Sequence, residues 1–318
     1  MTSPVKNMAK YRQHCLDEPS IPIFSRDWWL DAICGKDNWD VTLLEKDGRI
    51  IGSMPYYTKK RLGFTFLIHP PLTQTLGPWI RPSMAKYAKR LGYQKKVMGR
   101  LIEKLPRFDF FSQNCHYCNT NWLPFFWRGF EQTTRYTYLL PELSSEEALW
   151  RELEENTRRE IRKATSRFQL KVRDDLGIDA FLKLNKMTFE RQGMALPYTE
   201  DLIKRLDSAC SERCCRKIWI AEDEMKHHHA CVYIVWDENS AYYLMGGGNT
   251  ELRKSGATSF VMWEAIKHAA TVTQKFDFEG SMLEPVERFF RAFGAKQTPY
   301  SQITKTNSRL LKIKKAFK

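Results

Sequence analysis

The stretch Phe276-Asp277-Phe278-Glu279 alternates aromatic and acidic side chains. Side chains two positions apart on a strand point to the same face, so Asp277 and Glu279 are predicted to share one face while the phenylalanines pack inward. Neighbouring carboxylates raise each other's pKa, which suits a proton acceptor near neutral pH. Such a base could deprotonate an amine that attacks an acyl carbonyl. We therefore take Asp277 and Glu279 as candidate catalytic residues and Glu284 as a third; the alternative is that they cap the following helix.

A glycine-rich segment upstream could bind the activated partner of such a reaction. The run Gly246-Gly247-Gly248 would let a strand splay or bulge beside an acyl group. Arg253 and Gly256 then precede an expected helix at Ser259–Ala270, whose N-terminal N–H groups favour an anion. The donor-binding candidates are Gly247, Gly248, Arg253 and Gly256. The alternative interpretation is a simple turn that caps a helix.

Aromatic and cationic side chains elsewhere could hold a phosphorylated or nucleotide-linked acceptor. They occur in the segment Pro55–Arg61, in the proline-broken loop 69–79, and on the basic helix that follows residue 155. The substrate-binding candidates are Tyr56, Lys59, Gln74, Trp79, Arg159, Arg162, Ser281 and Arg288. A strand with a solvated basic end, and a solvated helix face, are the alternatives that these patterns leave open.

A strand–turn–strand pattern occurs once in each half of the chain. Val41–Leu44 and Arg49–Thr58 flank a turn that ends in Asp47-Gly48, and Arg216–Ala221 and Ala230–Trp236 flank a charged turn 177 residues downstream. This echo and the length of 318 residues predict two similar domains. We expect them at 1–140 and 141–318, the second with a basic C-terminal tail. A capping box at Ser144 and Glu147 predicts one helix running to about residue 168.

The composition indicates a globular protein with a broadly positive surface. The net charge is +14, and residues 1–150 and 151–318 each carry +7. Such a surface attracts tRNA, phosphate-rich cofactors and anionic membrane. No signal peptide or apolar stretch of about 20 residues is visible, so we expect a cytoplasmic protein without a transmembrane segment. The eight cysteines are then reduced thiols, and the spacing Cys115–Cys118 lacks a second half, so no metal site is predicted.

Three segments resemble FemAB-like proteins, which are tandem transferases of the GNAT (acyl-CoA N-acyltransferase) superfamily. Glu155–Ala164 looks like the arginine-rich helix that begins the second domain of these proteins. Phe276–Ser281 followed by Val286–Ala295 resembles the late strand–helix motif of the superfamily. Pro71–Gly77 looks like the first-domain loop of a bacterial branch. The resemblance implies an α/β (α+β) fold of two tandem GNAT-like domains, each a mixed, mostly antiparallel sheet flanked by helices.

The resemblance also implies an activity, with the donor left open. Members of the family transfer amino acids from aminoacyl-tRNA to peptidoglycan precursors, and relatives in polysaccharide gene clusters are thought to use acyl-CoA. We therefore expect an acyl or aminoacyl transferase that acts on an amine of a cell-envelope precursor, with either donor as substrate and no tightly bound cofactor. The donor pattern of the superfamily has a small residue where Thr258 stands, which puts CoA binding in doubt.

Two alternatives remain open at this point. One is an acetyl-CoA-dependent N-acyltransferase of a sugar or small amine. The other is a non-catalytic tRNA- or RNA-binding protein on the same scaffold. A small-molecule or cell-wall-precursor acceptor, tRNA and the surface of an anionic membrane are the candidate partners.

Overall fold

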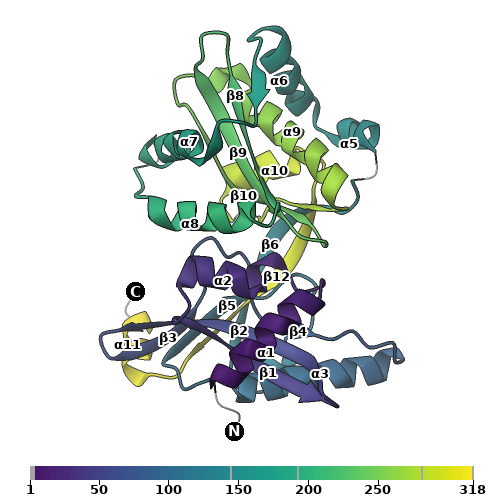
Figure 1. Ribbon diagram of the computed structural model, residues 1–318, viewed down its shortest axis with the longest axis vertical. Helices are drawn as coiled ribbons and strands as arrows, with labels where there is room; N and C mark the ends of the chain where they lie inside the picture. The colour runs from purple at the N-terminus through teal and green to yellow at the C-terminus, as the bar shows by residue number, and fades with distance from the viewer. Residues whose placement is uncertain (1–3, 144, 192, 281, 317–318) are drawn as a thin grey trace. The chain divides into compact units, whose positions relative to one another are not determined.

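The computed structural model describes residues 4–143, 145–191, 193–280 and 282–316 (Figure 1). Its contacts divide the chain into two compact units. Unit 1 comprises Met1–Arg135 with Pro299–Lys318, and unit 2 comprises Tyr136–Thr298. The predicted division at 140 and 141 lies near the first of these boundaries. The last twenty residues group with unit 1, because the strand at the end of the chain pairs with a strand of that unit.

Unit 1 is a mixed sheet with helices. Its strand order is β1-β2-β3-β5-β12, and β4 also pairs with β2. Strands β3 and β5 run parallel, and the other strand pairs described for this unit are antiparallel. The strands are β1 (Trp39–Lys46), β2 (Arg49–Arg61), β3 (Phe64–Ile68), β4 (Trp79–Ile80), β5 (Phe110–Asn114) and β12 (Lys296–Thr306), and the helices are α1 (Pro4–Asp17), η1 (Ile23–Ser25), α2 (Asp27–Cys34), α3 (Tyr87–Glu103), α4 (Leu123–Phe126) and α11 (Arg309–Ala316).

The elements of unit 1 follow from local sequence and from apolar spacing. The β1–β2 turn needs positive φ, and Asp47 (52°) and Gly48 (74°) supply it, as the sequence predicts. On α3, the side chains of Val97, Met98, Leu101 and Ile102 are buried against the sheet at helical spacing. Helix α1 was not predicted, although Met8, Tyr11 and Cys15 recur at intervals of three and four and pack into a core cluster.

Unit 2 is also a mixed sheet, and its strand order is β6-β11-β10-β9-β8-β7. Strands β10 and β11 run parallel, and the other strand pairs described for this unit are antiparallel. The strands are β6 (Glu131–Leu140), β7 (Lys171–Arg173), β8 (Arg216–Glu222), β9 (His228–Trp236), β10 (Ala241–Gly248) and β11 (Phe276–Asp277), and the helices are α5 (Glu146–Glu152), α6 (Glu155–Ser166), α7 (Gly177–Arg191), α8 (Glu200–Ser211), η2 (Arg253–Ser255), α9 (Ala257–Val272) and α10 (Glu284–Arg291).

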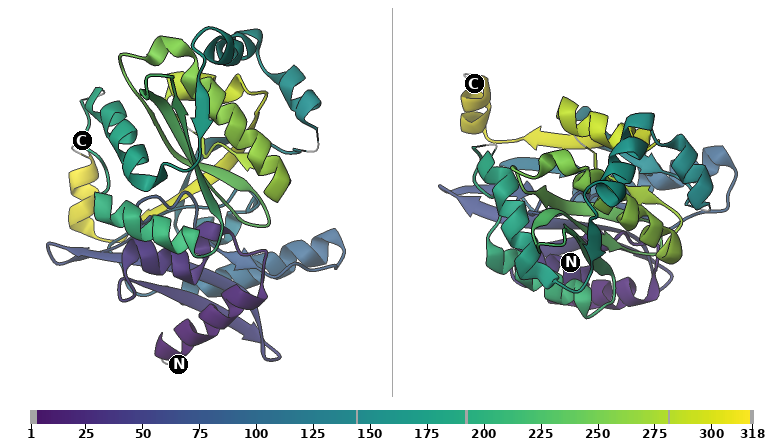
Figure 2. Two further views of the ribbon diagram at one scale, coloured as in Figure 1. Left: turned by 45° about the horizontal axis from the view of Figure 1, so that its top comes forward. Right: turned by 90° about the horizontal axis from the view of Figure 1, so that it is seen from above.

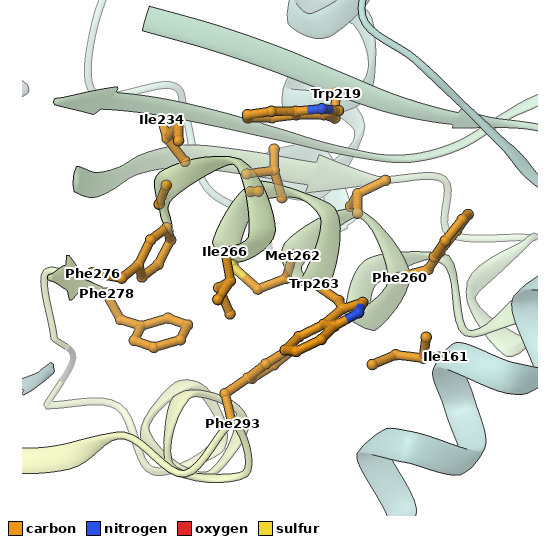
Figure 3. Packing of buried hydrophobic residues seen from close by; sticks show 14 of the residues in the cluster. Ile161, Trp219, Ile234, Phe260, Met262, Trp263, Ile266, Phe276, Phe278 and Phe293 are labelled. Atoms are coloured by element: carbon orange, nitrogen blue, oxygen red, sulfur yellow. The ribbon is translucent and has the colours of Figure 1, made fainter. Parts of the chain in front are cut away.

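Helices cover both faces of the unit 2 sheet (Figure 1, Figure 2). Alternate residues of β9 face opposite ways: Val232 and Ile234 belong to the core cluster with α9, whereas the Cys231 Sγ lies 3.9 Å from the Phe181 carbonyl of α7. In Figure 3, side chains of α9 lie among Trp219, Phe276 and Phe278. Because both faces of the sheet are covered, the sequences of β8 and β9 are nearly continuous runs of apolar residues.

The single helix predicted from residue 144 to about 168 was wrong. The structure has two helices, α5 and α6, which are separated at Leu153 and Glu154. The Glu154 N–H donates to the Ala292 carbonyl (2.9 Å) instead of continuing the helix. Ser144 lies outside the described residues, and Ser145 caps α5 by accepting from the Ala148 N–H (3.2 Å).

Candidate active site

The two parallel strands of unit 2 run together only briefly. β10 and β11 pair at Ala241–Phe276 and Tyr242–Asp277 and no further. β10 continues for six more residues, and its register against β9 skips between Tyr243 and Met245. The chain leaves β11 at Glu279 and Gly280, both of which have positive φ (60° and 64°). The register skip is a bulge in β10 just before the glycine run, near which the sequence predicted a splay or bulge.

Asp277 ends β11 in a buried position. Its side chain accepts a hydrogen bond from the Thr137 hydroxyl of β6 and from the Glu279 N–H (2.8 Å). Burial raises the pKa of the Asp277 carboxyl to about 6, because the charged form loses solvation, and the two hydrogen bonds lower it by less. The pKa of Asp277 is thus raised by burial, and not by the charge of a neighbouring carboxylate as the sequence suggested.

Glu279 lies next to Asp277 and is 8% exposed. Burial, and then the charge of Asp277, raise its pKa well above the ordinary range. The predicted strand geometry differs: β11 ends at Asp277, so strand alternation does not place the two acids together. They meet because the chain turns at Glu279. A Cβ on Gly280 would lie 2.1 Å from the Tyr136 carbonyl, so the turn is held against β6.

A group of polar side chains around the buried Asn185 was not predicted. The Tyr198 hydroxyl donates to Asn185 Oδ1 (3.1 Å), and Asn185 Nδ2 donates to the Gly246 carbonyl (2.7 Å). The pKa of Tyr243 is raised by burial and, to a smaller extent, by the charges of neighbours that include Tyr198 and Glu279. Tyr243 stands just before the glycine run, so the sequence alone could have suggested it as a site residue. The contact of Asn185 on α7 with Gly246 could not be predicted, because it joins residues far apart in the chain.

The predicted donor-binding glycines make close backbone contacts. A Cβ on Gly247 would lie 2.7 Å from the Asn185 N and Cα atoms, and the Gly248 N–H donates to the Thr188 hydroxyl (2.9 Å). A Cβ on Gly256, whose φ is 79°, would lie 2.2 Å from the Glu160 carbonyl. Close packing against α7 at Gly247 and against α6 at Gly256 accounts for glycine at these two positions, whereas a Cβ on Gly248 would meet no atom closer than 3.4 Å. A donor-binding role for them stays a prediction.

The start of α9 presents polar groups to solvent. Arg253 and Thr258 are exposed, whereas Ser255, the N-cap Gly256 and Ala257 are buried. The Ala257 N–H donates to the Ser255 hydroxyl (3.4 Å), so Arg253 is the exposed group at this end of the helix that can attract an anion. The branched side chain of Thr258 stands on that turn, as the sequence suggested.

The other predicted residues of unit 2 lie on exposed helices. Glu284 begins α10 and is exposed, as is Arg288 one turn later. Ser281 lies outside the described residues. Arg159 donates to Asn156 (2.7 Å), and Arg162 pairs with Glu155 (3.4 Å). Both of these contacts stay within α6, and the roles of these residues in catalysis or substrate binding stay predictions.

The predicted residues of unit 1 are dispersed. Tyr56 is 8% exposed and its hydroxyl donates to Asp40 (3.2 Å), and Trp79 is 9% exposed and donates to Ser20 (3.0 Å). Lys59 is exposed near the end of β2, whereas the Gln74 carbonyl accepts from Asn114 (3.2 Å). Tyr56 and Trp79 belong to two different core clusters. Their role in binding an acceptor stays a prediction.

The described ranges contain neither a metal-binding cluster nor a membrane-spanning helix. Over these ranges, no group of three or more His, Cys, Asp or Glu side chains is arranged to hold a metal ion. Within the same part of the chain, no helix has both the length and the apolarity to span a bilayer.

Comparisons with known proteins identify the fold of this chain. Residues 151–290, all within unit 2, match the family model described as an acetyltransferase (GNAT) domain. The crystal structure of FemX aligns with a TM-score of 0.67 at 14% identity, over 95% of this chain and 96% of that chain. The chain has a FemAB-like tandem GNAT fold. The expected fold class is thereby confirmed, and residues 151–290 match an acetyltransferase domain, as expected of an acyltransferase.

Two further solved structures share this tandem GNAT fold. The C-terminal domain of a putative lysylphosphatidylglycerol synthetase from Agrobacterium fabrum aligns with a TM-score of 0.56 at 11% identity, over 96% of this chain and 93% of that chain. A tandem GNAT protein from the clavulanic acid biosynthesis pathway aligns with a TM-score of 0.50 at 8% identity, over 96% of each chain. No curated protein matches the sequence.

Proposed function

We propose that unit 2 transfers an acyl or aminoacyl group from an activated donor to the amine of a cell-envelope precursor, with Glu279 as the base. The observation that carries the proposal is the buried pair Asp277–Glu279 where β11 leaves β10. Burial raises the pKa values of both carboxyls, so each holds a proton more tightly than an exposed acid does. The GNAT domain match covers both residues.

The proposed chemistry assigns different tasks to the two acids. An amine reacts only when neutral, so Glu279 takes its proton as the nitrogen attacks the acyl carbonyl. The new C–N bond forms while the C–S bond of a thioester, or the C–O bond of an aminoacyl ester, breaks, and the leaving group accepts a proton. Asp277 raises the pKa of Glu279 and fixes its main chain through the 2.8 Å hydrogen bond. Asp277 is therefore a positioning residue in this scheme.

The bulged part of β10 supports the carbonyl in the proposed reaction. The β9 register skips Leu244, because Tyr243 pairs with Ile234 and Met245 pairs with Tyr233. Main-chain N–H groups at such a bulge can stabilise an oxyanion. The N-terminal end of α9, together with Arg253, would hold the phosphate of either donor.

The proposal extends to the chemical identity of the donor and the acceptor. FemX and the lysylphosphatidylglycerol synthetase domain share the fold, and this likeness supports aminoacyl transfer for the cell envelope. Acyl-CoA is the second candidate, because GNAT proteins use it and the clavulanic acid pathway structure is described as the form without AcCoA. It would suit transfer to a sugar or a small amine.

A paired assay with acetyl-CoA and charged tRNA tests the proposal. The transferred acyl group is followed by radiolabel on a muropeptide or amino-sugar acceptor, and thermal shift reports donor binding. Wild-type protein should transfer from one donor, and Glu279→Gln should lower kcat about 100-fold or more with donor binding retained. Glu224→Gln, at an exposed turn between β8 and β9, is the matched control and should retain activity.

Two outcomes would contradict the proposal. Full activity in Glu279→Gln would show that Glu279 is not the base. Wild-type protein that binds RNA but transfers from neither donor would favour a non-catalytic RNA-binding protein.

A further inference from the structure

Helix α4 in unit 1 exposes large apolar side chains to solvent. Leu123 is 38%, Phe126 is 56% and Trp127 is 58% exposed. The same short segment buries Pro124 and Phe125, so the exposed side chains are held on a rigid turn. Contiguous exposed apolar side chains of this size mark an interaction surface more often than single ones do. We call Leu123, Phe126 and Trp127 the α4 patch.

Cations of α3 lie beside the α4 patch. The Lys95 ammonium is 5.3 Å from the centre of the Trp127 ring. The two helices pack closely next to this contact: a Cβ on Gly99 would lie 2.8 Å from the Arg128 guanidinium, which pairs with Glu103. Lys95 and the patch therefore form one surface.

The α3 sequence is strongly basic on its exposed positions. It contains five cations, Lys89, Arg90, Lys95, Lys96 and Arg100, against the single acid Glu103. All but Lys95 of these cations are exposed, and Lys95 is half-buried against Trp127. The helix that packs beside the patch thus carries exposed positive charge, and its Lys95 contacts the Trp127 ring.

We propose that the α4 patch and the basic side of α3 form a docking surface for an anionic lipid bilayer. Tryptophan and phenylalanine rings prefer the headgroup–acyl boundary, where leucine adds buried apolar area. Lysine and arginine side chains beside them meet lipid phosphates. The aliphatic Leu123 and the outward-facing Phe126 favour a lipid over RNA, for which stacked rings and cations alone would serve.

This inference is independent of the proposed transfer reaction. None of its residues takes part in the proposed acyl transfer, and all of them belong to unit 1. A protein that failed the transfer assay could therefore still bind lipid, and an active transferase could fail to do so.

Vesicle co-sedimentation of the full chain tests the docking surface. Binding to phosphatidylglycerol-containing vesicles should exceed binding to pure phosphatidylcholine vesicles about 10-fold or more at 0.1 M salt. Phe126→Ser with Trp127→Ser should lower binding about 10-fold or more, and so should Lys95→Glu with Lys96→Glu. The apolar control is Leu62→Ser with Met225→Ser, two positions that are 84% and 77% exposed, and the charge control is Lys60→Glu with Arg61→Glu. Circular dichroism confirms that each variant is folded.

Three results would overturn the proposal. One is equal loss of binding in the controls and the patch variants. Another is an absence of vesicle binding combined with binding of a 20-nucleotide RNA that the patch variants lose. The last is a concentration-dependent dimer in ultracentrifugation that Phe126→Ser with Trp127→Ser abolishes, which would assign the patch to a second copy of the chain.

Discussion

Units 1 and 2 contain the same arrangement of strands around a parallel pair. In unit 1, β3 and β5 run parallel next to the β1–β2 hairpin. In unit 2, β10 and β11 run parallel next to the β8–β9 hairpin. Each parallel pair matches at only two positions, so both units have strands that soon part.

The two units differ in the chain beyond the parallel pair. In unit 1, Leu76 bridges to Cys115, and its N–H donates to the Asn114 carbonyl (2.9 Å), so the proline-broken loop continues the pairing beyond β5. In unit 2, the corresponding strand ends at the buried carboxyl of Asp277, and the chain turns at Glu279. Beyond the parallel pair, the chain thus continues backbone pairing in unit 1 and presents two carboxyl groups in unit 2.

This contrast indicates where to look for chemistry in a duplicated fold. Strand β5 has the sequence FFSQN, without a carboxylate. The family match also lies within unit 2. We infer that unit 2 carries the reaction, and unit 1 supplies surfaces such as the α4 patch.

The largest expected effect distinguishes a crowded glycine in unit 2 from an open one in unit 1. Gly256 and Gly63 have the same φ, 79°, but a Cβ on Gly63 would have no neighbour within 4 Å. Gly63→Ala should cost about 1 kcal/mol of unfolding free energy through backbone strain alone. Gly256→Ala should cost at least about 2 kcal/mol more, because α6 must move. Urea unfolding measures both; equal losses would show that contact with Glu160 does not constrain the loop.

A smaller effect is expected from Asp277→Asn on stability. The folded pKa of Asp277, about 6, is above the unfolded value, so the folded state holds this proton more tightly. The stabilisation is fully present below the unfolded pKa and is lost as pH rises from about 4 through 6. At pH 8 the asparagine variant should therefore be more stable than wild type by on the order of 2 kcal/mol, and the gain should vanish near pH 4. Thermal melts between pH 4 and 8 measure it; a variant less stable than wild type at pH 8 would contradict the burial argument.

Much of the fold could be predicted where local rules decide. The turn residues Asp47-Gly48 predicted the β1–β2 hairpin, and the predicted strands Arg216–Ala221 and Ala230–Trp236 lie within β8 and β9. Prediction failed where distant contacts decide. The 144–168 helix breaks because Glu154 bonds to Ala292.

The candidate site shows the same division. The acidic residue types and the aromatic alternation identified Asp277 and Glu279. Their actual geometry depends on Gly280 pressing against Tyr136, a contact across more than 140 residues of sequence that spacing cannot reveal. Tyr198 and Asn185 were missed for the same reason, since they approach β10 only when α7 packs on the sheet.

The pH dependence of kcat/KM for wild type and Asp277→Asn tests most directly whether the two acids form one catalytic pair. Wild-type activity should rise with pH as Glu279 loses its proton, with an apparent pKa well above that of an ordinary glutamate. Since the charge of Asp277 helps to raise the Glu279 pKa, Asp277→Asn should move the rise to lower pH. A rise that stays at the same pH in the variant, or a wild-type profile that is flat from pH 5 to 9, would contradict the assignment.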